Sequence, residues 1–209
     1  IFDSKLYHNR VPDQPGGGTV DWTNPWGEHK FVNNIEARED GGTPAFIQTI
    51  KAALSIKLKE KMKTEYILAR EEELINIVFD EFEKIRGLHI LAGNVRHRLG
   101  AISFYVENVH YNLIVKLLND RYGIQTRGGC SCAGTYGHYL LNVCPVTSKY
   151  IADKIENGDL SDKPGWIRLS IHPTMSNEEA YFITAAVKEI VEKINEFQDD
   201  YFYDANRNE

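Results

Sequence analysis

The sequence predicts a small α+β domain over residues 64–209, within the broader α/β class, and a shorter region of different character over residues 1–63. Residues 64–209 alternate helical and strand patterns, in the order helix, two strands, helix, strand, loop, strand and a long final helix. Short strands between amphipathic helices are typical of a layered domain, in which helices cover a sheet.

Residues 1–43 are rich in glycine, proline and aromatic side chains, with Pro-Gly-Gly-Gly at 15–18 and Trp-Thr-Asn-Pro-Trp at 22–26. This composition excludes a regular helix and predicts strands joined by structured loops, beginning with a strand at residues 1–6. The stretch has no complete core of its own, so another part of the protein or another chain is expected to cover it. Because the chain begins at isoleucine without a signal peptide, we expect a segment cut from a longer protein.

The helices are predicted from apolar side chains at helical spacing. Thr43 suits an N-cap and Pro44 the first helical position, so a helix is expected from there to about residue 63. Its apolar positions are Ile47, Ile50, Leu54 and Leu58. Further helices are predicted over residues 65–86, 108–121 and 177–197, and strands over residues 88–92, 100–106, 124–126 and 166–171. The acidic tail after residue 198 is expected to fray.

Composition and charge exclude several classes of function. The formal net charge is −6 and the basic residues are scattered, whereas nucleic-acid binding requires a concentrated basic face. No apolar run approaches the roughly 20 residues that a membrane span needs, so we expect no membrane association. Three cysteines in 209 residues do not suggest a disulfide framework, and a reducing, cytoplasmic location is expected.

The glycine-rich segment 127–137 is the first candidate for chemistry, because it surrounds Cys130 and Cys132. Glycines let a loop move, so a thiol there can reach into a site and withdraw. A tight turn with small buried cysteines explains the same pattern. A metal site is disfavoured, because Cys-x-Cys lacks the usual gap and a second ligand pair, although His138 and Cys144 are near in sequence. Cys144 lies in an apolar stretch and is interpreted as inert packing.

Two further positions suit anions. Arg168 lies inside the predicted strand 166–171, where its guanidinium either points outward as a surface group or holds a carboxylate through two parallel hydrogen bonds. The corner at Gly42, Thr43 and Pro44 offers a hydroxyl and free N–H groups at a helix start, which is a ready anion site. Plain capping is the simpler explanation of that corner as a local motif.

The order and spacing of these motifs resemble the class V aminotransferase family, in particular its cysteine desulfurases and selenocysteine lyases. The motifs are Gly-Thr-Pro at 42–44, Arg-Gly-Gly-x-x-Cys at 127–132 and Ile-Arg-Leu-Ser at 167–170. The resemblance implies the aspartate-aminotransferase fold, with this chain forming the C-terminal small domain and the last strands of the large domain. It also implies a pyridoxal 5′-phosphate (PLP) cofactor, a small amino-acid substrate and a homodimer with sites at the interface.

The same resemblance implies roles for single residues. Cys132 corresponds to the cysteine that accepts sulfur, and Arg168 to the arginine that holds the substrate carboxylate. Thr43, next to Gly42, corresponds to the residue that reaches across the dimer to the phosphate of the partner's cofactor. A protein that accepts the sulfur is a further possible partner.

Lys30 does not match the lysine that holds the cofactor in such enzymes. The family places that lysine several tens of residues before Gly-Thr-Pro, whereas Lys30 closely precedes Thr43. The chain is therefore expected to start just after the cofactor lysine, to bind no PLP by itself and to be inactive alone.

Two alternatives remain open at the level of sequence. One is a class V aminotransferase acting on another amino acid. The other is a stand-alone thiol-relay or dimerisation module without a cofactor. Thr43 and Arg168 favour an enzyme, because a relay module needs neither.

Overall fold

The computed structural model describes residues 3–130 and 133–208. The chain divides into two compact units, Ile1–Lys61 and Met62–Glu209. The assignment of residues 1–63 to a large cofactor domain and of residues 64–209 to a small domain stays a prediction.

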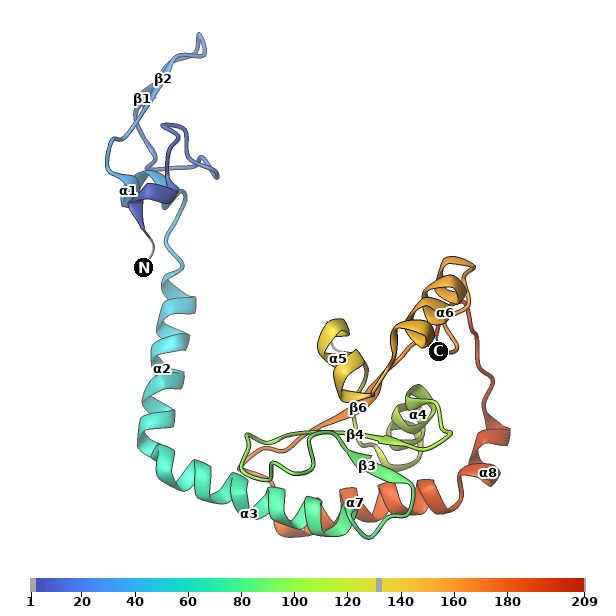
Figure 1. The fold of residues 1–209 in the computed structure, drawn as a ribbon. Coiled ribbons are helices and arrows are strands. Elements are labelled where there is room, and N and C mark those ends of the chain that lie inside the picture. Colours follow the sequence, from blue (N-terminus) through green and yellow to red (C-terminus); the bar gives the residue numbers. More distant parts are fainter. Residues whose placement is uncertain (1–2, 131–132, 209) are drawn as a thin grey trace. The chain divides into compact units, whose positions relative to one another are not determined.

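The first unit contains a hairpin, short helices and one long helix (Figure 1). Its elements are the 3-10 helix η1 (Ser4–Leu6), β1 (Val20–Thr23), β2 (His29–Phe31), α1 (Ile35–Glu39) and α2 (Phe46–Met62). The last residue of α2, Met62, belongs to the second unit. β1 and β2 pair antiparallel. Of the strand predicted at residues 1–6, the described part is wrong, since η1 occupies Ser4–Leu6. Helix α1 was not predicted, although its Asn34 cap, which accepts from the Ala37 N–H at 2.9 Å, is a recognisable start signal.

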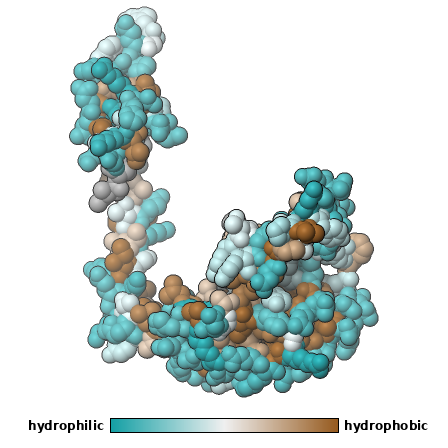
Figure 2. Space-filling view, viewed as in Figure 1, coloured by the Kyte–Doolittle hydropathy of each residue, from teal (hydrophilic) through white to brown (hydrophobic). Residues whose placement is uncertain are grey.

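The long helix α2 begins at Phe46, so Thr43 is not its N-cap and Pro44 is not its first residue. None of its residues is buried. The predicted apolar stripe is exposed: Ile47 67%, Ile50 58%, Leu54 60% and Leu58 58%. Apolar side chains reach the surface along this helix (Figure 2). Among the described residues, buried hydrophobic side chains begin only at Leu74, in the second unit.

The second unit is built around a four-stranded antiparallel sheet in the order β3-β4-β6-β5. The strands are β3 (Leu88–Ile90), β4 (Ala101–Val106), β5 (Arg127–Gly129) and β6 (Trp166–Ser170). The helices are α3 (Thr64–Phe82), α4 (Tyr111–Tyr122), α5 (Gly134–Leu140), α6 (Pro145–Glu156), α7 (Asn177–Glu192) and α8 (Ile194–Phe197), followed by η2 (Gln198–Asp200). Helices α3 and α7 lie side by side on one side of the sheet, and α5 lies on the other (Figure 1).

The core lies between the sheet and helices α3, α4 and α7. Successive strand residues face opposite sides of a sheet, so Ile167 and Leu169 share one face, on which they pair with Phe104 and Ile102. All four side chains are buried. The helices contribute Leu74, Val78, Phe79, Ile114, Leu117, Leu118, Val187 and Ile190. The helices expected over residues 65–86 and 177–197 from their apolar spacing are present, and α3 and α7 each bury an apolar stripe.

Several predicted boundaries in this unit are wrong. The strand expected at residues 124–126 lies at 127–129 instead, as β5. The segment 127–137, interpreted as a loop, is part strand and part helix, and α6 was not predicted. The final helix stops at Glu192, before the short α8.

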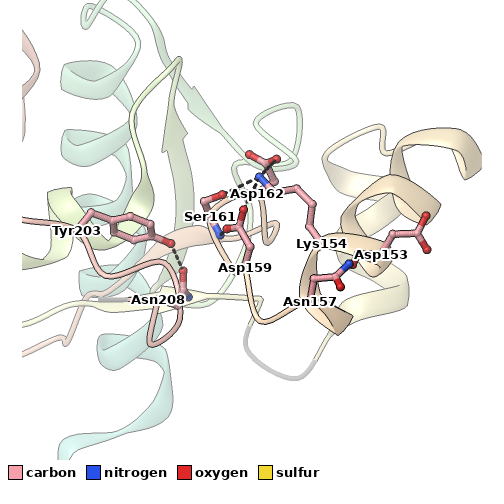
Figure 3. Close-up of polar contacts among 8 residues, drawn as sticks. All are labelled: Asp153, Lys154, Asn157, Asp159, Ser161, Asp162, Tyr203 and Asn208. Carbon is pink, nitrogen blue, oxygen red and sulfur yellow. Dashed lines mark hydrogen bonds and ion pairs between the residues drawn. The ribbon is translucent and has the colours of Figure 1, made fainter.

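The tail does not fray: Leu160 donates its N–H to the Ala205 carbonyl at 2.8 Å, and Asn208 Nδ2 donates to the Tyr111 hydroxyl at 2.8 Å. A polar cluster beside the tail fixes the approach to β6 (Figure 3). Lys154 Nζ lies 3.0 Å from Asp159 Oδ2 and 2.7 Å from Asp162 Oδ2. Hydrogen bonds from Ser161 and Lys154 lower the pKa of Asp159 to about 2.

Two glycines allow the buried ring of Tyr111 to pack against the sheet. A Cβ atom on Gly165 would lie 2.3 Å from Tyr111 Cε1, and one on Gly128 would lie 3.0 Å from Tyr111 Cδ2. Separations of this size are clashes, and Tyr111 is 6% exposed, so its ring has little room to move. Glycine is therefore required at position 165 by packing.

We expect Gly165→Ala to lower the free energy of unfolding by about 1–3 kcal/mol, the usual cost of overpacking. The ring can yield only by disturbing its hydrogen bond with Asn208. Urea unfolding of the variant measures the effect. Gly134→Ala is the matched control, because a Cβ there meets nothing within 4 Å. Equal stability of the two variants would contradict the packing argument.

Candidate functional site

Arg168 lies in the middle of β6, on the face of the sheet opposite the core. In the register it pairs with Ser103 of β4 on one side and Arg127 of β5 on the other. Its neighbours Ile167 and Leu169 are buried in the core, so the alternation of the strand places Arg168 on the other face with Trp166. The strand thus presents one guanidinium between two flanking strands.

The Nε atom of Arg168 lacks an acceptor among the residues that the structure describes. This atom is buried, and no described residue accepts a hydrogen bond from or forms an ion pair with the guanidinium. A buried donor without an acceptor is costly and uncommon in folded proteins. A planar carboxylate is the acceptor that best matches a guanidinium, through two parallel hydrogen bonds. That Arg168 presents its guanidinium to an anion stays a prediction.

Helix α5 covers the same face at Trp166. A Cβ atom on Gly137 would lie 3.0 Å from the Trp166 ring, so the helix packs directly on that side chain. The connection from β5 to α5 begins at Cys130, whose carbonyl accepts from the Ala133 N–H at 2.9 Å. Cys132, the predicted nucleophile, lies outside the described residues.

The other two thiols differ in their surroundings. Cys130 is half-buried, and Cys144 is exposed. Cys144 precedes α6, and its Sγ lies 3.2 Å from Thr147 Oγ1. Hydrogen bonds from Thr147 lower the pKa of the Cys144 thiol. The interpretation of Cys144 as buried packing is therefore wrong.

Gly42 and Thr43 lie in the first unit, on a corner held by the loop before β1. The Gly42 N–H donates to the Gly17 carbonyl at 2.9 Å. The prediction that the N–H groups of this corner are free is therefore wrong for Gly42. A Cβ on Gly41 would lie 2.8 Å from the Gln14 carbonyl oxygen, so the two segments are in close contact. Thr43 is exposed, and neither its hydroxyl nor its N–H has a hydrogen-bond partner among the described residues.

Lys30 lies on strand β2 of the hairpin. Its Nζ is 3.2 Å from Asp21 Oδ2, and the two side chains are 59% and 44% exposed. An exposed ion pair of this kind does not provide the enclosed setting in which a lysine holds a cofactor.

Other types of site are not found in the described part of the chain. Residues 3–130 and 133–208 contain no group of three or more His, Cys, Asp or Glu side chains placed to hold a metal ion. Within the same ranges, no helix has both the length and the apolar character needed to cross a membrane.

Sequence reasoning did not identify the neighbours of Arg168 on its face of the sheet. Strand pairing between distant segments brings Ser103 and Arg127 beside it, whereas Trp166 lies two residues earlier on the same strand. The predicted strands at 100–106 and 166–171 were a usable signal, because alternation assigns a face to each residue. The register between the two strands, however, cannot be predicted from the sequence of either strand alone.

Comparison with known proteins identifies the family. The family model described as "Aminotransferase class-V" matches residues 1–181. Probable cysteine desulfurases of Staphylococcus aureus and Staphylococcus epidermidis are 25% and 26% identical to this chain over 129 residues. The match covers 62% of this chain and 30% of each relative, so it spans under a third of the length of these curated proteins.

Two solved structures have the same fold over most of this chain. The apo cysteine desulfurase of Thermococcus onnurineus NA1 aligns with a TM-score of 0.59 and 22% identity, covering 87% of this chain and 39% of that protein. The cysteine desulfurase CsdA of Escherichia coli, in an S-sulfonic acid form, aligns with a TM-score of 0.60 and 20% identity over the same shares. The predicted α/β fold of this enzyme class is confirmed, and the chain belongs to the class V aminotransferase family.

Proposed function

We propose that this chain is the C-terminal part of a PLP-dependent enzyme that removes sulfur from cysteine or selenium from selenocysteine. The observation that carries the proposal is the buried Nε of Arg168, which has no hydrogen-bond partner among the described residues; its guanidinium suits the α-carboxylate of an amino-acid substrate. The names of the curated relatives, probable cysteine desulfurases, support the choice of cysteine.

In this proposal Arg168 fixes the substrate by its carboxylate and Cys132 receives the sulfur. The Cys132 thiolate attacks the substrate sulfur, an S–S bond forms and the C–S bond breaks. The electron pair of the C–S bond remains on the β-carbon, where protonation yields alanine. The persulfide on Cys132 then passes its sulfur to an acceptor protein or to a small thiol.

Gly42 and Thr43 fit one end of the cofactor, its phosphate. Thr43 is exposed, its hydroxyl and N–H have no partner in residues 3–130 and 133–208, and the corner is fixed by the hydrogen bond from Gly42 to Gly17. Lys30 does not fit the other end, because it is engaged with Asp21 on an exposed hairpin. When bound, PLP supplies an electron sink for negative charge at the substrate carbon.

We further propose that the enzyme is a homodimer in which Thr43 of one copy contacts the phosphate bound by the other. The exposed apolar stripe of α2, which follows Thr43 directly, supports an assembled state. Side chains such as Ile47 and Leu54 are 67% and 60% exposed here. Burial of such a stripe against another part of the protein or a second copy is favourable.

The full-length protein with PLP is expected to convert L-cysteine to alanine and sulfide in equal amounts when a reducing thiol is present. Amino-acid analysis and a colorimetric sulfide assay measure the two products. Formation of a keto acid without alanine would instead identify an aminotransferase. Absence of any product from cysteine and selenocysteine would contradict the proposal.

A further inference from the structure

A cavity of about 1020 Å³ lies between α4 and the C-terminal segment that follows α8. Its size is at the upper end of the range of about 300–1,000 Å³ that is usual for small-molecule sites. The wall includes His110, Lys116 and Thr126 on one side and Tyr201, Phe202 and Tyr203 of the tail on the other. The cavity therefore exists because the tail packs back on α4.

Three contacts hold the tail in this position. The Tyr201 hydroxyl donates to Asp120 Oδ2 at 3.3 Å, and the Tyr203 hydroxyl donates to Asn208 Oδ1 at 2.9 Å. Asn208 in turn donates through Nδ2 to the hydroxyl of Tyr111 at 2.8 Å. Tyr203 and Asn208 are both drawn in Figure 3. The wall of the cavity is thus an ordered part of the second unit.

Two wall residues carry buried polar atoms that have no partner in the described structure, His110 Nε2 and Thr126 Oγ1. His110 Nδ1 accepts from the Asn112 N–H at 3.2 Å, so a neutral imidazole carries its proton on Nε2 and offers it as a donor. Burial lowers the pKa of His110 more than its contact with Asn208 raises it, which favours that neutral form. The threonine hydroxyl is also able to donate. Both atoms are satisfied if a bound molecule provides an acceptor.

The charge of the wall selects for anions. Lys116 and Arg207 belong to it, and no Asp or Glu does within the described residues, although the chain has 30 acidic and 24 basic residues. Asp120 Oδ2 lies 3.6 Å from Lys116 Nζ, so this cation is only loosely paired by that carboxylate. An anion in the cavity would meet the positive side chain of Lys116 and two neutral donors.

The tail adds an aromatic surface to this polar wall. Tyr201, Phe202 and Tyr203 are consecutive wall residues, and Phe202 is 91% exposed. Aromatic side chains gain most from contact with flat apolar groups. We propose that the cavity is a binding site for a small organic anion with an aromatic body, whose anionic group contacts Lys116, His110 and Thr126.

This site differs from the proposed substrate site in its place on the sheet. Helix α4 buries Ile114 and Leu117 in the core, on the face of Ile167 and Leu169. Arg168 lies on the opposite face of the same strand. The ligand is therefore not expected to compete with an amino acid held by Arg168.

The test is a titration of the 209-residue chain followed by two-dimensional amide NMR, with 2-naphthoate as the aromatic anion. Its neutral amide, 2-naphthamide, and inorganic phosphate are the two comparison probes. We expect naphthoate to shift the amide signals of Thr126 and Asn112 and to bind about tenfold more tightly than either comparison probe, because only it has both charge and ring. Equal affinity for naphthamide or for phosphate would overturn the proposal.

Matched variants test the contacts. Lys116→Gln is expected to weaken naphthoate binding about 3- to 10-fold, the scale of one partly solvated charge contact. Lys188→Gln is its control, because Lys188 forms a similarly long pair with Glu192, at 3.9 Å, and lies outside the cavity. His110→Asn keeps an acceptor that caps α4 but removes the Nε2 donor, and should weaken binding by a similar factor. If Lys116→Gln and Lys188→Gln bind naphthoate equally, or if the wall amides do not shift, the site does not exist.

Discussion

Replacement of Arg168 by lysine in the full-length protein is expected to lower kcat/KM for cysteine by roughly 10- to 150-fold, about 1.5–3 kcal/mol of transition-state binding. Lysine keeps the positive charge but cannot form two parallel hydrogen bonds with a carboxylate. It also removes the buried Nε donor, which no described residue satisfies. Steady-state kinetics with cysteine measure the loss.

Cysteamine separates this role from a structural one. It has the thiol and the amine of cysteine but no carboxylate, so Arg168→Lys should leave its slow turnover unchanged. Arg96→Lys is the matched control, because Arg96 is exposed and forms surface ion pairs with Asp80 and Glu83 at 2.7 Å. Equal losses with cysteine and cysteamine, or a kcat/KM for cysteine equal to wild type, would show that Arg168 has only a structural role in the sheet.

The part of the fold that could be predicted is the part with strong periodicity. Helices α3 and α7 repeat buried side chains such as Val78 and Val187 at helical spacing, and β6 alternates Ile167 and Leu169 with Arg168 and Ser170. These patterns report which face is buried, and burial is the dominant favourable term in folding. The structure of such segments can therefore be predicted from their own residues.

The segments that were predicted wrongly depend on distant partners. Strand β5 is Arg-Gly-Gly, which has no hydrophobic pattern, and it is a strand because it pairs with β6. Helix α5 contains Gly134 and Gly137, and glycine in a helix costs about 1 kcal/mol relative to alanine. Gly137 is nevertheless required there, because Trp166 lies against it. Neither fact can be read from the local sequence.

The structures of the tail and of the Arg168 site also depend on residues that are distant in the sequence. An acidic C-terminal segment has the composition of a frayed end, yet Asn208 reaches Tyr111, far earlier in the chain. For Arg168 the strand predicted two opposite orientations, inside a site or on the surface. The missing information was the pairing with Ser103 and Arg127, which decides whether Nε has a partner. Pairing between strands is a property of the whole fold.

Cys144 is the strongest rival to Cys132 as a nucleophile in this protein. It is exposed, and Thr147 lowers the pKa of its thiol, so it holds more thiolate near neutral pH than an ordinary cysteine. Its position before α6, however, places it outside the connection between β5, which pairs with the strand of Arg168, and α5. High thiolate content alone therefore does not select the sulfur acceptor, because the thiol must also reach the substrate.

Replacement of Cys132 by serine in the full-length protein is expected to reduce alanine and sulfide release from cysteine to less than about one hundredth of wild type, since a serine hydroxyl is not ionised near neutral pH. Cys132 follows Gly129 at the spacing found in cysteine desulfurases, and the connection that contains it joins β5, beside Arg168, to α5, which covers Trp166. Cys130→Ser and Cys144→Ser are the matched controls and should retain most of the activity. Mass spectrometry after a single turnover should find the added sulfur on Cys132 alone. Full activity of Cys132→Ser would show that the segment only covers the site, and would favour an aminotransferase or a lyase that needs no thiol.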